Sequence, residues 1–141
     1  MINFSIKTED HNNVVHSITL PFDIRQKSRF KSNLDSGGEV TIMLPRGSRL
    51  KHGDVLQADS GDRVKVVAAL ENVSMVSTED QFLLMRICYH LGNRHVPLQI
   101  EKNAIYYQND HVLDEMVNGL GIQPVLVTRA FEPEAGAYAH H

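Results

Sequence analysis

The sequence contains a single cysteine, Cys88, among its 141 residues. One cysteine excludes an intrachain disulfide and a zinc site built from paired cysteines, and it is typical of a reducing compartment. No apolar run approaches the roughly 20 residues that span a bilayer. The N-terminus also lacks the basic and apolar segments of a signal peptide. We therefore expect a cytoplasmic protein without a membrane span.

The chain has no excess of basic residues, since its formal net charge is −3. This disfavours nucleic acid as a partner, because phosphate binding needs a basic surface. The chain also lacks a Gly-x-Ser-x-Gly elbow, a phosphate-binding Gly-x-x-x-x-Gly-Lys loop and a His-Glu-x-x-His helix. Its carboxylates form no recognisable acid–base pair. We predict that the protein is not an enzyme and has no catalytic residues.

The first half of the chain has the pattern of short β-strands. In residues 40–44, Val40, Ile42 and Leu44 alternate with Thr41 and Met43. This alternation indicates a strand with one buried face. Gly, Pro and Asp clusters separate this strand from other short apolar runs. The basic stretch at residues 25–31 is most simply a solvated strand or loop. We predict a small all-β domain over residues 1–70, with its boundary within about 4 residues.

The second half alternates strands and helices. After a strand near residues 70–76, Thr78 and Gln81 match a capping box, and apolar residues at helical spacing follow. Gly92 is suited to end this helix in the left-handed conformation. A strand at residues 96–100 contains Pro97, which favours a sheet edge or the start of the strand.

Three more elements complete this half. A strand near residues 104–107 precedes a helix with Asp110 as its N-cap, and a strand at residues 124–128 follows. The order βαββαβ predicts a ferredoxin-like domain over residues 71–131, and hence an α+β protein overall. Residues 132–141 are expected to form a flexible tail.

Histidine is unusually abundant, with eight residues. Imidazole suits nickel, copper, zinc and iron, so it does not select one metal. His95 lies between the predicted helix and the next strand, where its simplest role is to bond a neighbouring carbonyl. It becomes a stronger metal candidate in a two-fold dimer, which brings two copies of one residue together. Such an open site suits an ion that must be released.

Several separated segments of the chain resemble the urease accessory protein E family, and the resemblance covers nearly the whole sequence. The segments are residues 88–99, which include Gly92-Asn93-Arg94-His95, and residues 21–25, 44–47, 111–114 and 131–138. The resemblance implies an N-terminal domain that binds a partner or peptide, and a C-terminal domain for metal binding and dimerisation. It also implies that His95 binds nickel at the interface of a homodimer.

The resemblance suggests further ligands. His111 matches the second of two histidines separated by one residue, whereas Asn109 stands at the first position and departs from that pair. His140 and His141 lie where some family members begin a histidine-rich tail, and they can also be a truncated tail or an expression remnant. The remaining histidines, His11, His16, His52 and His90, are expected to be surface or structural residues. Those in the β-domain are expected to lie at the surface without close acidic or histidine partners.

The resemblance thus implies a nickel metallochaperone that carries Ni(II) as cargo for urease maturation. Its partners would be the urease accessory GTPase, protein G, and the urease apoprotein. Cu(II) and Zn(II) accept the same ligands, and binding should fall below roughly pH 6 as imidazole protonates. A metal-independent assembly chaperone, an RNA-binding βαββαβ module and a histidine–metal enzyme are the alternatives.

Overall fold

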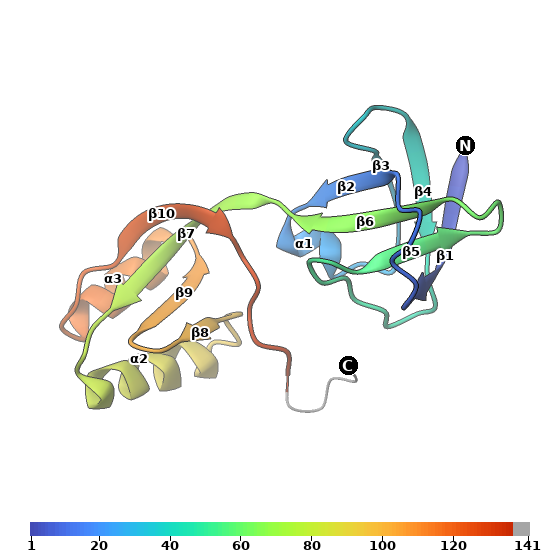
Figure 1. The fold of residues 1–141 in the computed structure, drawn as a ribbon. Coiled ribbons are helices and arrows are strands. Elements are labelled where there is room, and N and C mark those ends of the chain that lie inside the picture. Colours follow the sequence, from blue (N-terminus) through green and yellow to red (C-terminus); the bar gives the residue numbers. More distant parts are fainter. Residues whose placement is uncertain (137–141) are drawn as a thin grey trace. The chain divides into compact units, whose positions relative to one another are not determined.

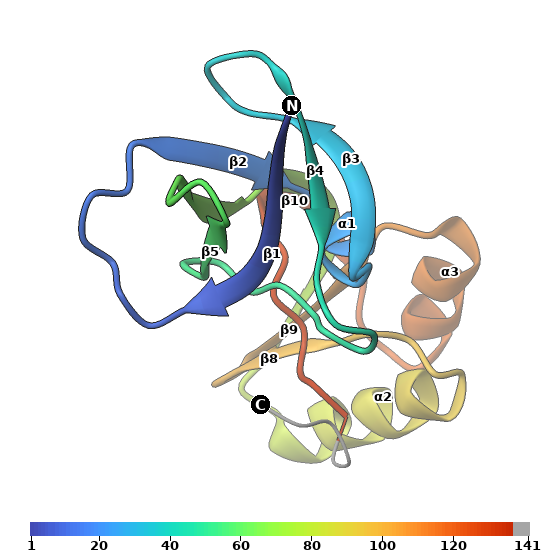
Figure 2. The same ribbon diagram turned by 90° about the vertical axis from the view of Figure 1, so that its right-hand side faces the viewer.

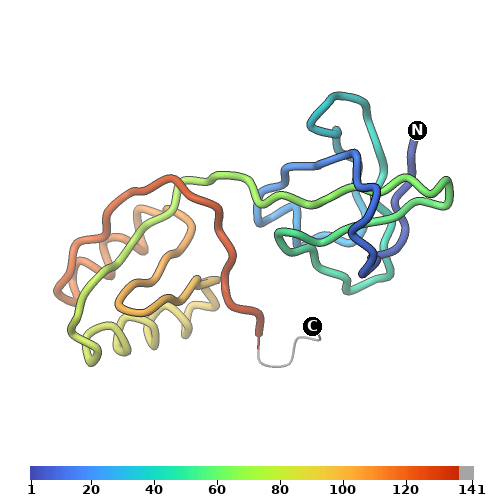
Figure 3. The backbone as a smooth tube through the Cα atoms, in the orientation of Figure 1, coloured from blue at the N-terminus to red at the C-terminus, as the bar shows by residue number. Residues whose placement is uncertain are grey.

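The computed structural model describes residues 1–136 and forms two compact units, Met1–Ala69 and the residues from Leu70 onward. We refer to them as unit 1 and unit 2. Unit 1 is mainly a β-sheet, and unit 2 combines a second sheet with two helices (Figure 1). The chain completes unit 1 before it enters unit 2 (Figure 3). This architecture confirms the predicted α+β class.

Unit 1 contains a six-stranded sheet with the order β2-β6-β5-β1-β4-β3. The pairs β1–β4 and β2–β6 are parallel, whereas β1–β5, β3–β4 and β5–β6 are antiparallel. Strand β3 is therefore an edge strand of this sheet and, within residues 1–136, pairs only with β4 (Figure 2). The elements are β1 (Ile2–Thr8), β2 (His16–Leu20), α1 (Phe22–Arg25), β3 (Arg29–Asn33), β4 (Glu39–Met43), β5 (Val55–Ala58) and β6 (Arg63–Ala68).

The core of unit 1 follows the alternation seen in the sequence. Val40, Ile42 and Leu44 are all buried, as predicted, because alternate residues of a strand point to the same face. The prediction of a wholly solvated basic stretch is wrong at Arg25, which is only 2% exposed. Its Nε donates a hydrogen bond to the Leu20 carbonyl at 3.1 Å, which satisfies part of the buried guanidinium.

Unit 2 has the order β7 (Leu70–Ser77), α2 (Gln81–Asn93), β8 (Gln99–Glu101), β9 (Ala104–Gln108), α3 (His111–Gly119) and β10 (Val125–Ala130). Its antiparallel sheet has the strand order β10-β7-β9-β8. This is the predicted βαββαβ arrangement, in which each helix connects strands that are not neighbours. The edge position of β8 agrees with the expectation from Pro97, which lies two residues before this strand.

Both helices of unit 2 pack on one face of its sheet. From the helices, Leu84, Ile87, Leu91 and Val117 share a buried cluster with Val76, Ile105 and Tyr107 from the strands. The buried residues of α2 recur every three or four positions, as a helix with one face in the core requires. The sheet and this cluster hold the C-terminal end of α2 and the N-terminal end of α3 in place.

Aspartates cap both long helices. Asp110 accepts hydrogen bonds from the amides of Val112 and Leu113, as predicted for the N-cap of α3. The cap of α2 is Asp80, which accepts from the Leu83 amide, so the predicted Thr78 capping box is wrong. Thr78 instead accepts a hydrogen bond from the Asp80 amide two residues later and fixes the turn before the helix.

Candidate metal centre

Helix α2 ends in a hydrogen-bonded turn that places His95 at the surface. The His95 amide donates to Gly92 O at 2.9 Å, and the Val96 amide donates to Leu91 O at 3.2 Å. This is the pattern of a Schellman motif, whose left-handed position normally holds glycine. Here His95 occupies that position, with φ of 59°, whereas Gly92 lies inside the helix. The prediction that Gly92 adopts the left-handed conformation is therefore wrong by three residues.

The conformation of His95 has an energetic cost. Steric contact between Cβ and the backbone makes a left-handed non-glycine residue less stable by about 1–2 kcal/mol. The residue is exposed, and no side-chain hydrogen bond or ion pair of its ring occurs within residues 1–136. The ring thus does not bond a neighbouring carbonyl, which was its simplest predicted role. The exposed residue is therefore available to an external ligand.

His111 is the first residue of α3 and is also exposed. Its Nε2 lies 3.0 Å from Oε1 of Glu115, one helical turn later, and its side chain is 86% exposed. The pair forms an imidazole and a carboxylate on one helix face, because residues four apart are neighbours there. The field of the helix N-terminus disfavours a cation at His111, and the Glu115 charge opposes that effect.

The topology brings His95 and His111 to the same end of unit 2. Strands β8 and β9 are antiparallel, with Gln99 opposite Tyr106, so the start of β8 and the end of β9 lie at one end of the sheet. His95 precedes β8 and His111 follows β9. Even so, no cluster of three or more metal-ligand side chains occurs in the part of the chain that the structure describes. Within residues 1–136, one protomer therefore does not bring three such ligands together.

Asn109 has a structural role beside these residues. Its side-chain amide donates to Ser74 Oγ at 3.0 Å and to Asp114 Oδ2 at 3.2 Å. Asp114 Oδ1 also accepts from Ser74 Oγ at 2.7 Å and from the Tyr107 hydroxyl at 2.6 Å. We define Ser74, Tyr107, Asn109 and Asp114 as the Asp114 network. It ties the start of α3 to strands β7 and β9 and uses the Asn109 amide for that purpose.

The other predicted candidates are dispersed. His90 is half-buried and packs edge-on against Tyr89, which agrees with a structural role. Burial raises the pKa of the Cys88 thiol, so this residue favours the thiol over the metal-binding thiolate. His140 and His141 lie outside the described residues. Neither His90 nor Cys88 belongs to a cluster of three or more potential metal ligands within residues 1–136.

Two histidines of unit 1 have partners that the sequence did not indicate. His16 Nε2 lies 3.8 Å from Asp62 Oδ1, so the expectation of no close acidic partner is wrong at this position. His52 Nδ1 accepts a hydrogen bond from the Ala68 amide at 3.1 Å. Strand pairing brings these distant positions together, and neither forms a cluster of three metal ligands in residues 1–136.

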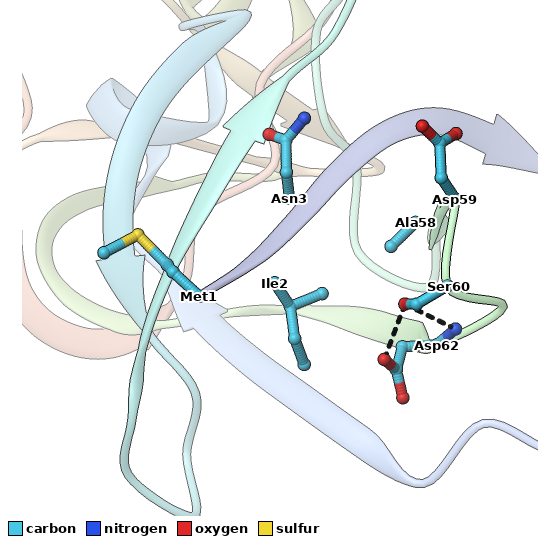
Figure 4. Close-up of a pocket in the computed structure, with 7 residues that line it drawn as sticks. All are labelled: Met1, Ile2, Asn3, Ala58, Asp59, Ser60 and Asp62. Carbon is cyan, nitrogen blue, oxygen red and sulfur yellow. Dashed lines mark hydrogen bonds between the residues drawn. The ribbon is translucent and has the colours of Figure 1, made fainter.

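An open pocket in unit 1 lies near His16. Its Asp62 carboxylate accepts a hydrogen bond from Ser60 Oγ at 2.7 Å (Figure 4). The remaining lining residues are mostly small or polar, and the pocket offers no histidine or cysteine. The seven lining residues are Met1, Ile2, Asn3, Ala58, Asp59, Ser60 and Asp62. The His95 end of unit 2 therefore stays the candidate for metal binding.

An apolar stripe on α2 is a feature that the sequence reasoning missed. Phe82, Met85 and Tyr89 are 69%, 63% and 66% exposed, and their spacing places them along one outer face of the helix. The stripe runs toward the end of the helix that carries His95. The sequence could have indicated this stripe, because the apolar residues of α2 occupy two faces of the helix. A helix with two apolar faces is normally covered on both faces.

Comparisons with known proteins identify the relatives of this chain. Residues 4–69 match the family described as "UreE urease accessory protein, N-terminal domain", and residues 71–141 match "UreE urease accessory protein, C-terminal domain". The chain is 55% identical to the urease accessory protein UreE of Alkalilimnicola ehrlichii over 122 residues, which are 86% of this chain and 75% of the relative.

Two further relatives are also named urease accessory protein UreE. The protein of an Enterobacter species is 48% identical over 139 residues, which cover 98% of this chain and 91% of the relative. The protein of Proteus mirabilis is 51% identical over 122 residues, which cover 86% and 76%. These relatives are named as accessory proteins rather than enzymes, in agreement with the prediction. No helix within residues 1–136 is long and apolar enough to cross a membrane.

Proposed function

Because the chain belongs to the UreE urease accessory protein family, we propose that it carries Ni(II) for assembly of the urease active site. The observation that carries this proposal is the exposed ring of His95, held in a left-handed turn at the end of α2. A conformation with an energetic cost at an exposed residue suggests a functional constraint on that residue. Nickel is the cargo, and Cu(II) and Zn(II) can occupy the same imidazole ligands.

We propose that the complete site forms in a homodimer. Two-fold symmetry places the same residue of each protomer beside the axis, so two His95 rings can share one ion. The apolar stripe of Phe82, Met85 and Tyr89 supports this arrangement, since it is exposed in the protomer and leads toward His95. Pairing along α2 would cover the stripe and bring the two helix ends together.

Auxiliary ligands complete the proposal. His111 and Glu115 lie at the same end of unit 2 as His95 and offer one nitrogen and one oxygen ligand. We propose that His140 and His141 add imidazole ligands from the C-terminal end of the chain. A site with two shared ligands and weaker auxiliary ones holds an ion less tightly than a closed cage of four, and it therefore releases the ion more readily.

The delivery step requires a partner with a tighter nickel site. We propose the urease accessory GTPase, protein G, as that partner and the urease apoprotein as the final recipient, in the cytoplasm. Unit 1 is proposed to contact a partner protein, whereas unit 2 binds the metal and forms the dimer. No covalent chemistry is needed, because the ion moves from weaker to stronger ligands.

The test is nickel calorimetry of the His95→Gly protein. Glycine suits the left-handed turn, so this variant removes the ring without the backbone cost that alanine would carry. We expect the tightest nickel phase to disappear, while the dimer mass stays unchanged and the thermal unfolding temperature does not fall. His111→Ala is the matched control, and it should affect only weaker binding. An unchanged tight phase in His95→Gly would exclude His95 as the ligand.

The same variant separates carriage from metal-independent assembly. A cell that contains apo-urease and the remaining accessory proteins should activate less urease at limiting nickel when His95 is replaced by glycine. Full activation by the variant under those conditions would favour a chaperone that assembles urease components without carrying metal.

A further inference from the structure

We propose that the outer edge of β3 in unit 1 binds an extended peptide segment of a partner protein in which acidic residues alternate with apolar ones. This inference rests on the proposed role of unit 1 in partner binding, and it names the surface and the chemistry. The binding mode is addition of a strand to an open sheet edge, in which backbone hydrogen bonds supply affinity and side chains supply specificity.

The hydrogen-bond register shows that β3 has an open edge. Leu44 N donates to Ser28 O, and Leu34 N donates to Gly38 O, at the two ends of the β3–β4 pair. Bonded and non-bonded pairs alternate in an antiparallel ladder, so Phe30 and Ser32 bond to β4. The amides and carbonyls of Arg29, Lys31 and Asn33 therefore point away from β4. No backbone partner for them occurs within residues 1–136.

The other end of the sheet is protected. Asp35 N donates to Ser17 O on β2 at 2.9 Å, and the Thr19 amide donates to the Asp35 carboxylate at 3.0 Å. These bonds occupy backbone groups of β2 that a new strand would need. Protection of one edge is a common way to prevent unwanted pairing. Between the two terminal strands, β3 is the one that can accept a partner strand.

The surface around β3 is basic. Arg29 and Lys31 lie on the strand itself, and backbone bonds from Leu44 N to Ser28 O and from Leu50 N to Arg25 O bring a second basic segment beside it. All members of this surface are exposed, and none forms an ion pair with another described residue. We define the β3 basic surface as Lys27, Arg29, Lys31, Arg46 and Arg49.

The positive charge of Arg29 and Lys31 favours an acidic segment at the β3 edge over a second copy of β3. A second copy of β3 would place like charges opposite one another, which destabilises strand pairing, whereas acidic side chains opposite Arg29 and Lys31 would be attracted. Phe30 is half-buried between these two positions and points to the core side of the strand. A pairing segment therefore needs acidic residues on its outer face and apolar residues beside Phe30.

A strand partner also fits better than a nucleic acid. Single-stranded nucleic acid is normally held by exposed aromatic rings on which its bases stack. The exposed large apolar side chains of unit 1 are Met1, Ile6, Val15 and Met43, and none is aromatic. The unpaired backbone groups of β3 have no counterpart in a phosphate chain, but they match those of a peptide strand.

The experiment uses the full chain and a synthetic peptide of about six residues in which glutamate and valine alternate. Amide chemical shifts should change first at Arg29, Lys31 and Asn33. The same peptide with its pairing amides N-methylated keeps the charges but cannot donate to the strand, so it should bind at least roughly tenfold more weakly. Oligothymidylate should leave these amides unshifted.

Two variants of one residue separate backbone pairing from charge. Lys31→Gln removes the charge and keeps the outward amide, whereas Lys31→Pro removes both and leaves the β3–β4 bonds intact. We expect roughly twofold to fivefold weaker binding for the first, and a further loss for the second. Lys65→Gln, on the exposed side of β6, is the charge control and should bind normally.

The outcomes distinguish this inference from the proposed function. Equal binding of the N-methylated peptide would overturn strand addition, and displacement of the peptide by oligothymidylate would identify a nucleic-acid surface instead. Nickel is titrated into the same samples. Tight nickel binding without peptide binding would refute only the β3 proposal, whereas peptide binding without a His95-dependent nickel phase would refute only nickel carriage.

Discussion

Replacing Met85 with glutamate tests whether the apolar stripe of α2 forms the proposed dimer, on which the proposed nickel site depends. Full burial of a methionine side chain stabilises by about 1.5–3 kcal/mol. Because Met85 is 63% exposed in the protomer, association can recover about 1–2 kcal/mol from each copy, and hence about 2–4 kcal/mol from two. Met85→Glu forfeits this gain and also brings two unpaired carboxylates into an apolar contact, at a cost of several kcal/mol.

The expected result follows from these magnitudes. A total loss of about 5 kcal/mol weakens the dimer by more than a thousandfold, since 1.4 kcal/mol corresponds to a factor of ten. Sedimentation equilibrium should then report the mass of a single 15.9 kDa chain at concentrations where the unmodified protein is dimeric. The tight nickel phase should also disappear, although His95 is unchanged, because one protomer offers an incomplete site.

Two controls make the result specific. Val15→Glu introduces the same charge at an exposed apolar residue of unit 1 and should leave the dimer intact. Leu126→Glu changes a 60% exposed residue on β10, the edge strand opposite β8, which offers an alternative apolar surface of unit 2. If Leu126→Glu dissociated the protein and Met85→Glu did not, the dimer would form through β10 and our reasoning about α2 would be wrong.

Two further predictions concern residues that stabilise unit 2 and unit 1 internally. Burial raises the pKa of Tyr107 above its ordinary value of 10, and the hydrogen bond to Asp114 adds to the shift. The protonated hydroxyl therefore stabilises unit 2 below about pH 10 and loses this effect at higher pH. Tyr107→Phe should destabilise unit 2 by about 1–2 kcal/mol in denaturant titration and remove the tyrosine that ionises last in an alkaline absorbance titration. A Phe variant of unchanged stability would contradict this account of the Asp114 network. Hydrogen bonds from Ser17 and Thr19 hold the pKa of Asp35 below 3.8, so its carboxylate stabilises unit 1 above that pH and loses the effect as the pH falls through the lowered value. Asp35→Ala should make the Thr19 amide exchange its hydrogen roughly fivefold faster at neutral pH, which is equivalent to about 1 kcal/mol. Near pH 2, the unmodified protein and the variant should have the same free energy of unfolding in a denaturant titration.

Much of the fold could be predicted because local patterns and tertiary structure agree. The alternation at Val40, Ile42 and Leu44 and the N-cap at Asp110 depend on neighbours in the sequence, and both are confirmed. The start of α2 was misassigned because Thr78 and Asp80 can both accept a backbone amide, and only the turn geometry decides between them. Local patterns do not reveal that geometry.

The candidate site was only partly accessible to sequence reasoning. The position of His95 at an element boundary was predicted, but its left-handed conformation was not, because glycine is strongly favoured there and Gly92 lies three residues earlier. Asn109 was noted only as a missing histidine. Its role in the Asp114 network depends on Ser74, which is 35 residues away in the sequence and adjacent only in the folded sheet.

The distribution of charge between the two units bears on how nickel is captured. Residues 1–69 contain ten Lys or Arg and eight Asp or Glu, whereas residues 70–141 contain four and nine. We expect the negative field of the second half to attract a divalent cation over a distance, whereas the proposed His95 ligand would bind it directly. Attraction of this kind accelerates encounter and is screened by salt, whereas the imidazole bonds set the residence time. Raising the ionic strength should therefore slow nickel association and leave dissociation nearly unchanged. A carrier benefits when surface charge sets the association rate and ligand bonds set the dissociation rate. It can then capture the ion quickly and still release it, because few bonds hold the ion.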